Sequence, residues 1–116
     1  MPVEMSPARF DQLVAEALDA IPVELTSAMD NVVVLVEDSH PSDPHLLGLY
    51  EGVALTERTT SYGGLLPDRI FVYRTPILAM CSTEEEVVDE VAITVVHEIA
   101  HHFGIDDARL HELGWG

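Results

Sequence analysis

Two histidines and a glutamate near the end of the sequence are spaced so that they could bind a metal ion and activate water. They belong to the segment H-E-I-A-H-H-F-G-I-D-D, residues 97–107. On a helix, His97 and His101 lie on one face, because residues four apart are about one turn apart. Two imidazoles placed in this way can both bind one Zn²⁺ at about 2.0–2.1 Å. Glu98, one step round the helix, could then act as general base on a water at the metal, as in an H-E-x-x-H motif.

A catalytic zinc site also needs a third protein ligand and an open fourth position. Gly104 follows His101 by three residues, and Asp107 follows Gly104 by three. A sharp turn at the glycine would allow Asp107 to approach the metal from the side. Competing candidates for the third ligand are Asp106, His111 and Glu112. His102 is not a candidate, because it points about 100° away from His101 on the helix.

Other polar side chains could support this chemistry. Glu90 and Thr94 lie on the same polar helix face, and either could fix the tautomer of His97. Hydrolysis of a peptide bond passes through an oxyanion that needs a hydrogen-bond donor besides the metal. Tyr62 and Tyr73 are the candidate donors.

The long helix that carries the motif has clear start and stop signals. Thr83 with Glu86, or Ser82 with Glu85, can form a capping box, and Gly104 can end the helix. Apolar residues recur between these limits with the period of a helix. Asp106 or Asp107 can cap a short last helix over residues 108–113.

The rest of the sequence predicts one more helix and three strands. Ser6 and Pro7 open a first helix that Pro22 ends. Strands are expected over residues 31–37, over 46–55 with interruptions near Gly48 and Gly52, and over 69–74, where Pro76 ends the strand. A glycine inside a strand marks a bulge or a close approach of two backbones. A polar loop is expected over residues 56–68, and we expect Arg69–Arg74 to be a half-exposed edge strand on which an extended peptide could pair.

Together these elements predict a single α+β domain over residues 1–116. It would have an N-terminal helix, a small twisted mixed sheet, a long active-site helix and a short C-terminal helix. Hydrophobic residues make up 47% of the chain, enough for one core.

Charge and cysteine content limit the kinds of partner and compartment. The formal net charge of −16 argues against binding to nucleic acid or to an anionic membrane, both of which need clustered Lys and Arg. The one cysteine, Cys81, cannot form an intramolecular disulfide, which suits a reducing cytoplasm. No signal peptide and no apolar stretch of transmembrane length is recognisable. We therefore expect a cytoplasmic protein, taken to be a monomer.

The segment 97–107 resembles the H-E-x-x-H-x-x-G-x-x-D signature of zincin metallopeptidases with an aspartate as third ligand. Three further stretches make the chain similar to the small bacterial zincin-like proteins called minizincins: L-L-G-L-Y-E-G-V-A-L-T-E-R (47–58), Y-G-G-L-L-P-D-R-I (62–70) and V-Y-R-T-P-I (72–77). The resemblance implies one Zn²⁺ held by His97, His101 and Asp107, with Glu98 as catalytic base. Larger zincins have a subdomain or a Met-turn beyond the motif, whereas this sequence runs nine residues past Asp107, so much of the usual cleft is expected to be missing.

Three hypotheses follow. The leading one is a zinc-dependent metallopeptidase that hydrolyses a peptide or protein substrate with a zinc-activated water and Glu98 as base. The alternative is a regulatory or partner-binding module that holds zinc without protease activity. A third is a structural zinc with all four positions filled by protein, His111 or Glu112 being the fourth ligand, which predicts that chelation unfolds the chain.

Overall fold

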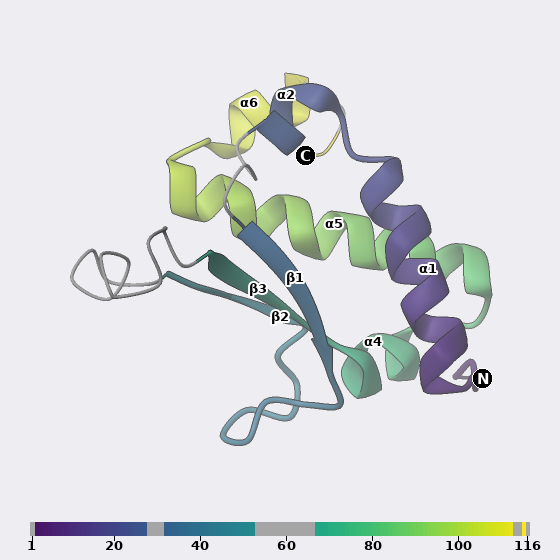
Figure 1. The fold of residues 1–116 in the computed structure, drawn as a ribbon. Coiled ribbons are helices and arrows are strands. Elements are labelled where there is room, and N and C mark those ends of the chain that lie inside the picture. Colours follow the sequence, from purple (N-terminus) through teal and green to yellow (C-terminus); the bar gives the residue numbers. More distant parts are fainter. Residues whose placement is uncertain (1, 28–31, 53–66, 113–114, 116) are drawn as a thin grey trace.

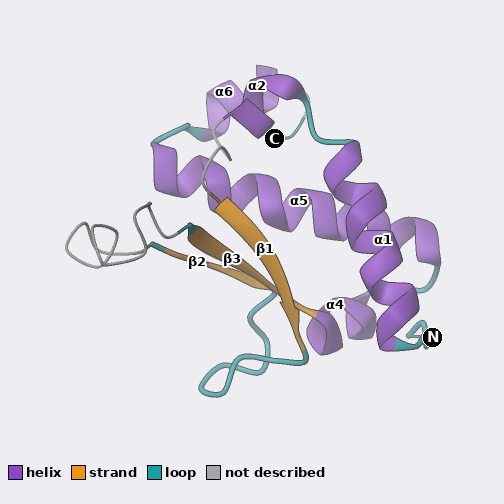
Figure 2. Cartoon of the chain, viewed as in Figure 1, coloured by secondary structure: helices purple, strands orange, loops and turns teal. Residues whose placement is uncertain are grey.

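One long helix packs against one face of a mixed sheet in the computed structural model (Figures 1 and 2). The structure describes residues 2–27, 32–52, 67–112 and 115. The elements in chain order are α1 (Pro7–Asp19), α2 (Val23–Thr26), β1 (Val32–Glu37), β2 (Gly48–Glu51), β3 (Asp68–Tyr73), α4 (Arg74–Met80), α5 (Glu84–Phe103) and α6 (Asp107–Glu112). The chain is therefore an α+β domain, as the sequence predicts.

Within the described residues, the sheet has the strand order β1-β3-β2. β1 pairs with β3 in parallel, with Val34 opposite Ile70. β2 pairs with β3 antiparallel, with Tyr50 opposite Ile70. The predicted edge strand over 69–74 is thus wrong: β3 is the central strand. Its apolar residues Ile70 and Val72 are fully buried, because β3 is flanked by a strand on each side and covered by α5.

Two other predictions of secondary structure need correction. The strand predicted over 69–74 ends at Tyr73 and leads directly into helix α4, which was not predicted and which starts at Arg74 with Pro76 in its first turn. Proline is tolerated there because the first N–H groups of a helix have no partner within it. The second strand is shorter than predicted, since β2 covers Gly48–Glu51. The predicted continuation of this strand over 53–55 and most of the loop over 56–68 lie outside the described residues.

Helix α1 begins, and helix α5 begins and ends, where their capping residues predict, whereas α1 ends at Asp19, before the predicted Pro22, and the short α2 was not predicted. The Oγ of Ser6 accepts a hydrogen bond from the N–H of Arg9 at 3.1 Å and caps α1. The Oγ1 of Thr83 accepts from the N–H of Glu86 at 3.1 Å and caps α5. Gly104 ends α5 in the left-handed conformation, with φ 72° and ψ 24°. These local interactions fix the length of the helix that carries the motif.

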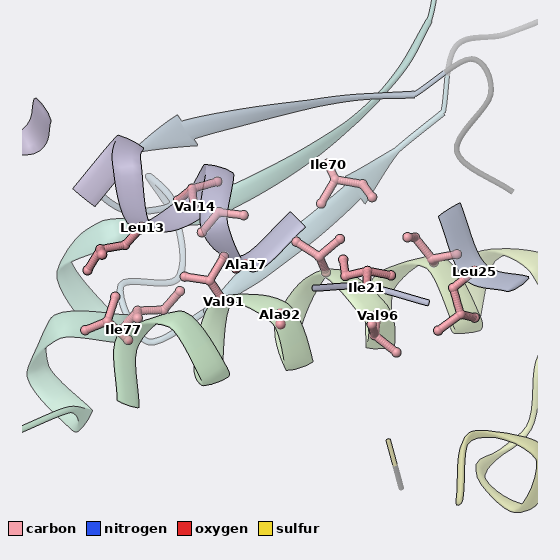
Figure 3. Close-up of a cluster of buried hydrophobic side chains, with 14 of the residues drawn as sticks. Leu13, Val14, Ala17, Ile21, Leu25, Ile70, Ile77, Val91, Ala92 and Val96 are labelled. Carbon is pink, nitrogen blue, oxygen red and sulfur yellow. The ribbon is translucent and has the colours of Figure 1, made fainter. Parts of the chain in front are cut away.

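The core lies between α1, α5 and the inner face of the sheet. Figure 3 shows side chains from α1, α2, β3, α4 and α5 converging on one cluster. Its fully buried members include Phe10 and Leu13 of α1, Ile70 of β3 and Val91 of α5. Leu110 of α6 is buried in the same cluster, so the C-terminal helix is fixed to the core. Of the helices that the structure describes, none is long and apolar enough to span a bilayer.

Candidate metal centre

His97 and His101 lie on the face of α5 that points away from the core. Their rings are nearly parallel, with an interplanar angle of 14° and centroids 6.3 Å apart. His97 is half-buried and His101 is exposed. Ile99, between them in sequence, is fully buried on the opposite side of the helix. Two adjacent imidazoles that solvent can reach fit two of the ligand positions of a zinc site.

Two of the acidic candidates for the third ligand already have partners on α6. Oδ1 of Asp106 accepts a hydrogen bond from the N–H of Arg109 at 2.8 Å, so Asp106 caps α6. Glu112, another candidate, forms an ion pair with Arg109 at 3.0 Å. Asp107 is the first residue of α6, and its side chain lies outside the described part of the structure.

His111, the remaining candidate for the third ligand, is exposed on α6. Within the described side chains, no three His, Cys, Asp or Glu residues gather as a metal site. The third ligand therefore stays a prediction: Asp106 and Glu112 have other partners, and Asp107 and His111 remain as candidates.

Glu98 contacts the edge of the sheet. The backbone N–H of Tyr50 in β2 donates a hydrogen bond to Oε1 of Glu98 at 2.9 Å. Among the described strands β2 has a single neighbour, β3, and alternate N–H groups of such an edge strand point away from the sheet. The carboxylate one residue after His97 is therefore held at the edge of β2.

Gly48 makes this close approach of β2 to α5 possible. A β-carbon built on Gly48 would lie 2.5 Å from Cγ2 of Thr94 and 3.1 Å from the carbonyl oxygen of Phe71. Of the two meanings that a strand glycine can have, the close approach is the correct one at this position. Thr94 is buried, and its methyl group points at β2.

A second group of side chains fastens β2 to the end of α5. The hydroxyl of Tyr50 donates to Oδ2 of buried Asp68 at 2.6 Å. The ring of His102 stacks on Tyr50, with centroids 3.8 Å apart, and its Nε2 lies 3.9 Å from the same Oδ2. Phe103 meets Tyr50 edge to face. This cluster keeps Tyr50, and with it the N–H that binds Glu98, against the helix.

None of these contacts was predicted from the sequence. His102 lies about 100° round the helix from His101, which excludes it as a ligand of the same metal and places it on the side of α5 that faces β2. This spacing is the one signal in the sequence that could have suggested its packing role. Tyr50 and Asp68 carry no local signal, because their contacts join three separate segments of the chain.

The two tyrosines that the sequence predicts as oxyanion donors are not found beside the histidines among the described residues. Tyr62 lies outside the described residues. Tyr73 is buried at the end of β3, where its ring stacks on Phe71 and meets His40 edge to face. Burial, with the negative charges of Glu37 and Glu51 as smaller causes, raises the pKa of the Tyr73 phenol. Because Ile70 and Val72 face α5 and successive side chains of a strand alternate, Tyr73 lies on the opposite face of the sheet and is not brought to the histidines.

Glu90 and Thr94 make no hydrogen bond to either histidine ring among the described residues. Their predicted role in orienting the rings gains no support from a contact.

A helix that carries H-E-x-x-H is typical of metalloproteases in which the two histidines bind zinc and the glutamate acts as base. The model of the zincin-like metallopeptidase family matches residues 29–115, and the chain belongs to this family. No protein of curated function is significantly similar to the chain.

A solved structure, described as a conserved hypothetical protein from Thermo thermophilus, is similar in fold. It superposes with a TM-score of 0.57, over 85% of this chain and 94% of that one. The two sequences are 23% identical. At this identity the likeness concerns the fold alone.

Proposed function

We propose that the protein is a zinc-dependent peptidase. In this proposal His97, His101 and Asp107 hold one Zn²⁺, and Glu98 is the general base. Membership of the zincin-like metallopeptidase family supports the assignment. The observation that carries it is the position of Glu98, which lies next to His97 in sequence and within hydrogen-bond distance of the edge of β2.

The residues of this site would have separate tasks. Bound zinc would supply Lewis acidity and make water easier to deprotonate near neutral pH. Glu98 would accept the proton of the attacking water as the C–O bond forms and deliver it to the leaving amine as the C–N bond breaks. The edge of β2 would align the substrate main chain by strand pairing.

Metal content tests the ligand set first. We expect one zinc per chain in the wild type by mass spectrometry of the intact complex, and loss or marked weakening in His97→Ala, His101→Ala and Asp107→Ala. Asp106→Asn is the control, because asparagine can keep the cap of α6 while it removes the neighbouring carboxylate. A variant of Asp107 that keeps full zinc occupancy would exclude this residue as the third ligand.

Turnover is tested with Glu98→Gln, which keeps the size of the side chain and removes its basicity. We expect zinc to be retained and kcat for peptide cleavage to fall by about 10²–10⁴-fold, the usual contribution of a general base. Normal cleavage by this variant would refute the mechanism. Bound zinc without cleavage of any peptide by the wild type would instead favour the non-catalytic zinc module.

A further inference from the structure

A hollow of about 450 Å³ opens beside His97 between α5, the end of α1 and the C-terminal segment. Its walls are mostly apolar and include Ala92, Ile93 and Trp115, with Ala20 at its α1 side. This volume lies in the range of about 300–1,000 Å³ that is common for ligand pockets. Because His97 forms part of the wall, a side chain in the hollow would lie next to the metal-binding face of α5.

A second hollow of about 310 Å³ continues from the first along the same two helices. The two share Val88 and Asp89 in their walls, so they form one groove between α1 and α5. We call this the α1–α5 groove. It leads from His97 toward the N-terminal end of α5.

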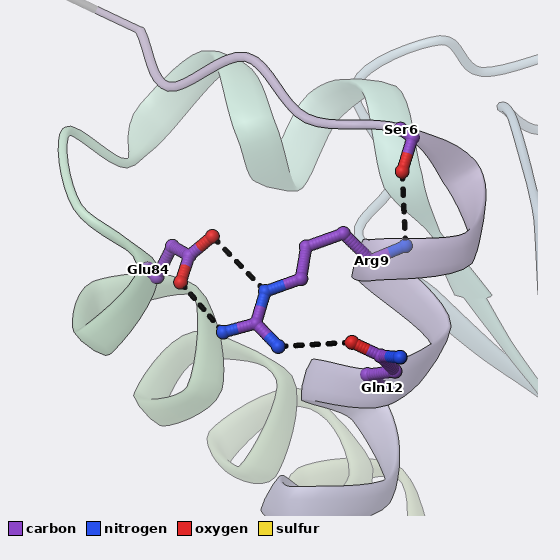
Figure 4. A network of polar contacts seen from close by, with 4 residues as sticks. All are labelled: Ser6, Arg9, Gln12 and Glu84. Carbon is purple, nitrogen blue, oxygen red and sulfur yellow. Dashed lines mark hydrogen bonds and ion pairs between the residues drawn. The ribbon is translucent and has the colours of Figure 1, made fainter.

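The charges along the α1–α5 groove are acidic apart from one arginine. Asp89, Glu85 and Glu16 are exposed along it; none of them forms a salt bridge with a described residue, and Glu16 has only a longer-range attraction to Arg9. Arg9, at the far end, is already bound by Glu84 through two hydrogen bonds of 2.7 and 3.1 Å (Figure 4). The groove therefore offers free carboxylates to a cationic ligand.

The spacing of these carboxylates can be converted into positions of a peptide. Along α5, Asp89 lies about 12 Å and Glu85 about 18 Å from His97, at about 1.5 Å per residue. An extended peptide covers about 3.3 Å per residue. The carboxylates are thus about four to six residues away from a scissile bond held at the metal.

We propose that the α1–α5 groove binds one side of a polypeptide substrate that has an apolar residue next to the scissile bond and Lys or Arg about four to six residues away from that bond. The apolar residue fills the hollow beside His97, and the basic residues pair with Asp89, Glu85 and Glu16. The proposal rests on the proposed peptidase function, because it places the scissile bond at the histidines.

Cleavage of matched peptides tests the preference. The zinc-loaded wild type is given peptides that share an apolar residue at the cleavage site and differ only in Lys or Glu at the distal positions. We expect at least a tenfold higher kcat/KM for the Lys series at low salt, and a smaller ratio at high salt because ions screen exposed charges. In the double variant Asp89→Lys/Glu16→Lys we expect this ratio to fall about tenfold. The control Asp11→Lys/Glu37→Lys changes the net charge equally away from the groove and should preserve the ratio.

The apolar hollow is tested separately with Ala20→Phe, which narrows it from an exposed position. We expect slower cleavage of peptides with a large apolar residue at the scissile bond and unchanged cleavage of those with alanine there. Equal rates for both peptides in wild type and variant would overturn the role of the hollow.

Binding without turnover distinguishes failure of the groove from failure of the peptidase. Trp115 is the only tryptophan and lines the hollow, so its fluorescence reports an occupant of zinc-loaded Glu98→Gln. If the wild type cleaves peptides without a preference for Lys, or if the double variant keeps that preference, the proposed role of the groove is wrong. The peptidase function then still stands. If the Lys peptide binds, the double variant weakens this binding and the wild type cleaves nothing, the role of the groove is supported and the peptidase function is wrong. If Glu98→Gln does not bind the Lys peptide and the wild type does not cleave it, both the role of the groove and the peptidase function are wrong.

Discussion

Glu98 is the residue at which the sheet and the metal-binding face of α5 meet. Its carboxylate accepts the N–H of Tyr50, whose ring is in turn held by Asp68 and His102. The position of the proposed base therefore depends on how closely β2 lies against α5. That distance is set at Gly48, where a side chain has no space.

Gly48→Ala is expected to separate β2 from α5. The new methyl group would lie 2.5 Å from Cγ2 of Thr94 and 3.1 Å from the carbonyl oxygen of Phe71, so either β2 or the Thr94 side chain must shift. Overpacking of this kind costs about 1–3 kcal/mol. We expect a lower free energy of unfolding in urea and, because Tyr50 moves away from Glu98, a lower kcat for peptide cleavage.

Two further variants test this explanation. Gly52→Ala adds the same methyl group just after β2, where the nearest atoms are at 3.8 Å, and is expected to change little. Thr94→Ser removes Cγ2 and should rescue part of the loss in the double variant with Gly48→Ala. A double variant no better than Gly48→Ala alone would rule out the overlap with Thr94 as the cause.

The sequence was informative about this site where its geometry is local. The helical repeat alone places His97 and His101 on one face and Glu98 one step round from it, so their relative positions could be predicted. Tyr50 and His102 come together only when β2 folds against the end of α5, and no spacing along the chain encodes that contact. The same limit applies to Tyr73, whose distance from the histidines depends on which face of the sheet α5 covers.

At the scale of elements, the ends of α5 are set by neighbouring residues and were predictable for that reason. Thr83 and Gly104 act within one turn of the helix. The order of the strands was not predictable, since an alternating pattern around Ile70 and Val72 suits an edge strand as well as a central one. The parallel partner of β3, β1, precedes it by a long connection that includes β2.

Gly104→Ala is expected to destabilise the protein by roughly 1–2 kcal/mol, the cost of the left-handed conformation for a residue with a β-carbon. A β-carbon at this position would meet nothing within 4 Å, so crowding makes no contribution. Gly104→Asn should cost less, because asparagine tolerates this conformation better. Thermal unfolding of the two variants measures the difference, and equal losses would contradict a conformational cause.

The pair formed by Arg9 and Glu84 connects the N-terminal ends of α1 and α5 (Figure 4). The hydrogen bond from Arg9 holds the pKa of the Glu84 carboxyl below its usual value. A carboxyl whose pKa is lower in the folded state contributes stability at neutral pH that is lost as the pH falls through the folded pKa. We expect Glu84→Gln to lower Tm slightly at about pH 7, and the difference from wild type to disappear toward about pH 3.

Glu85→Gln is the matched control for this pH dependence. Glu85 lies in the same first turn of α5 and has no ion pair among the described residues. It shares the favourable interaction of a carboxylate with the helix N-terminus and lacks the arginine. Equal effects of the two substitutions at every pH would show that Arg9 adds nothing.

At the scale of the whole molecule, the core and the candidate metal centre use different residues. The buried cluster is made of apolar side chains of α1, α2, β3, α4, α5 and α6. His97 and His101 lie outside it. The described core is therefore continuous without a contribution from these two side chains.

Chelation is accordingly expected to leave the protein folded. Removal of zinc should lower Tm only by the amount of free energy that zinc binding adds to the folded state, with unchanged far-ultraviolet circular dichroism at about 25 °C. In His97→Ala the chelator should have no effect on Tm. Unfolding of the wild type by chelation would instead support a structural zinc site.

The two faces of α5 also differ in the substitutions that they can tolerate during evolution. Mutations on the buried face, at positions such as Ile99, are removed because the protein no longer folds. His97, Glu98 and His101 do not belong to the buried cluster, so we expect substitutions there to leave a foldable chain, and a lineage can then lose the chemistry while its architecture persists. Shared architecture among descendants of one ancestor is therefore weak evidence that they share an activity, and each of them must be assessed on the residues that it retains at these three positions.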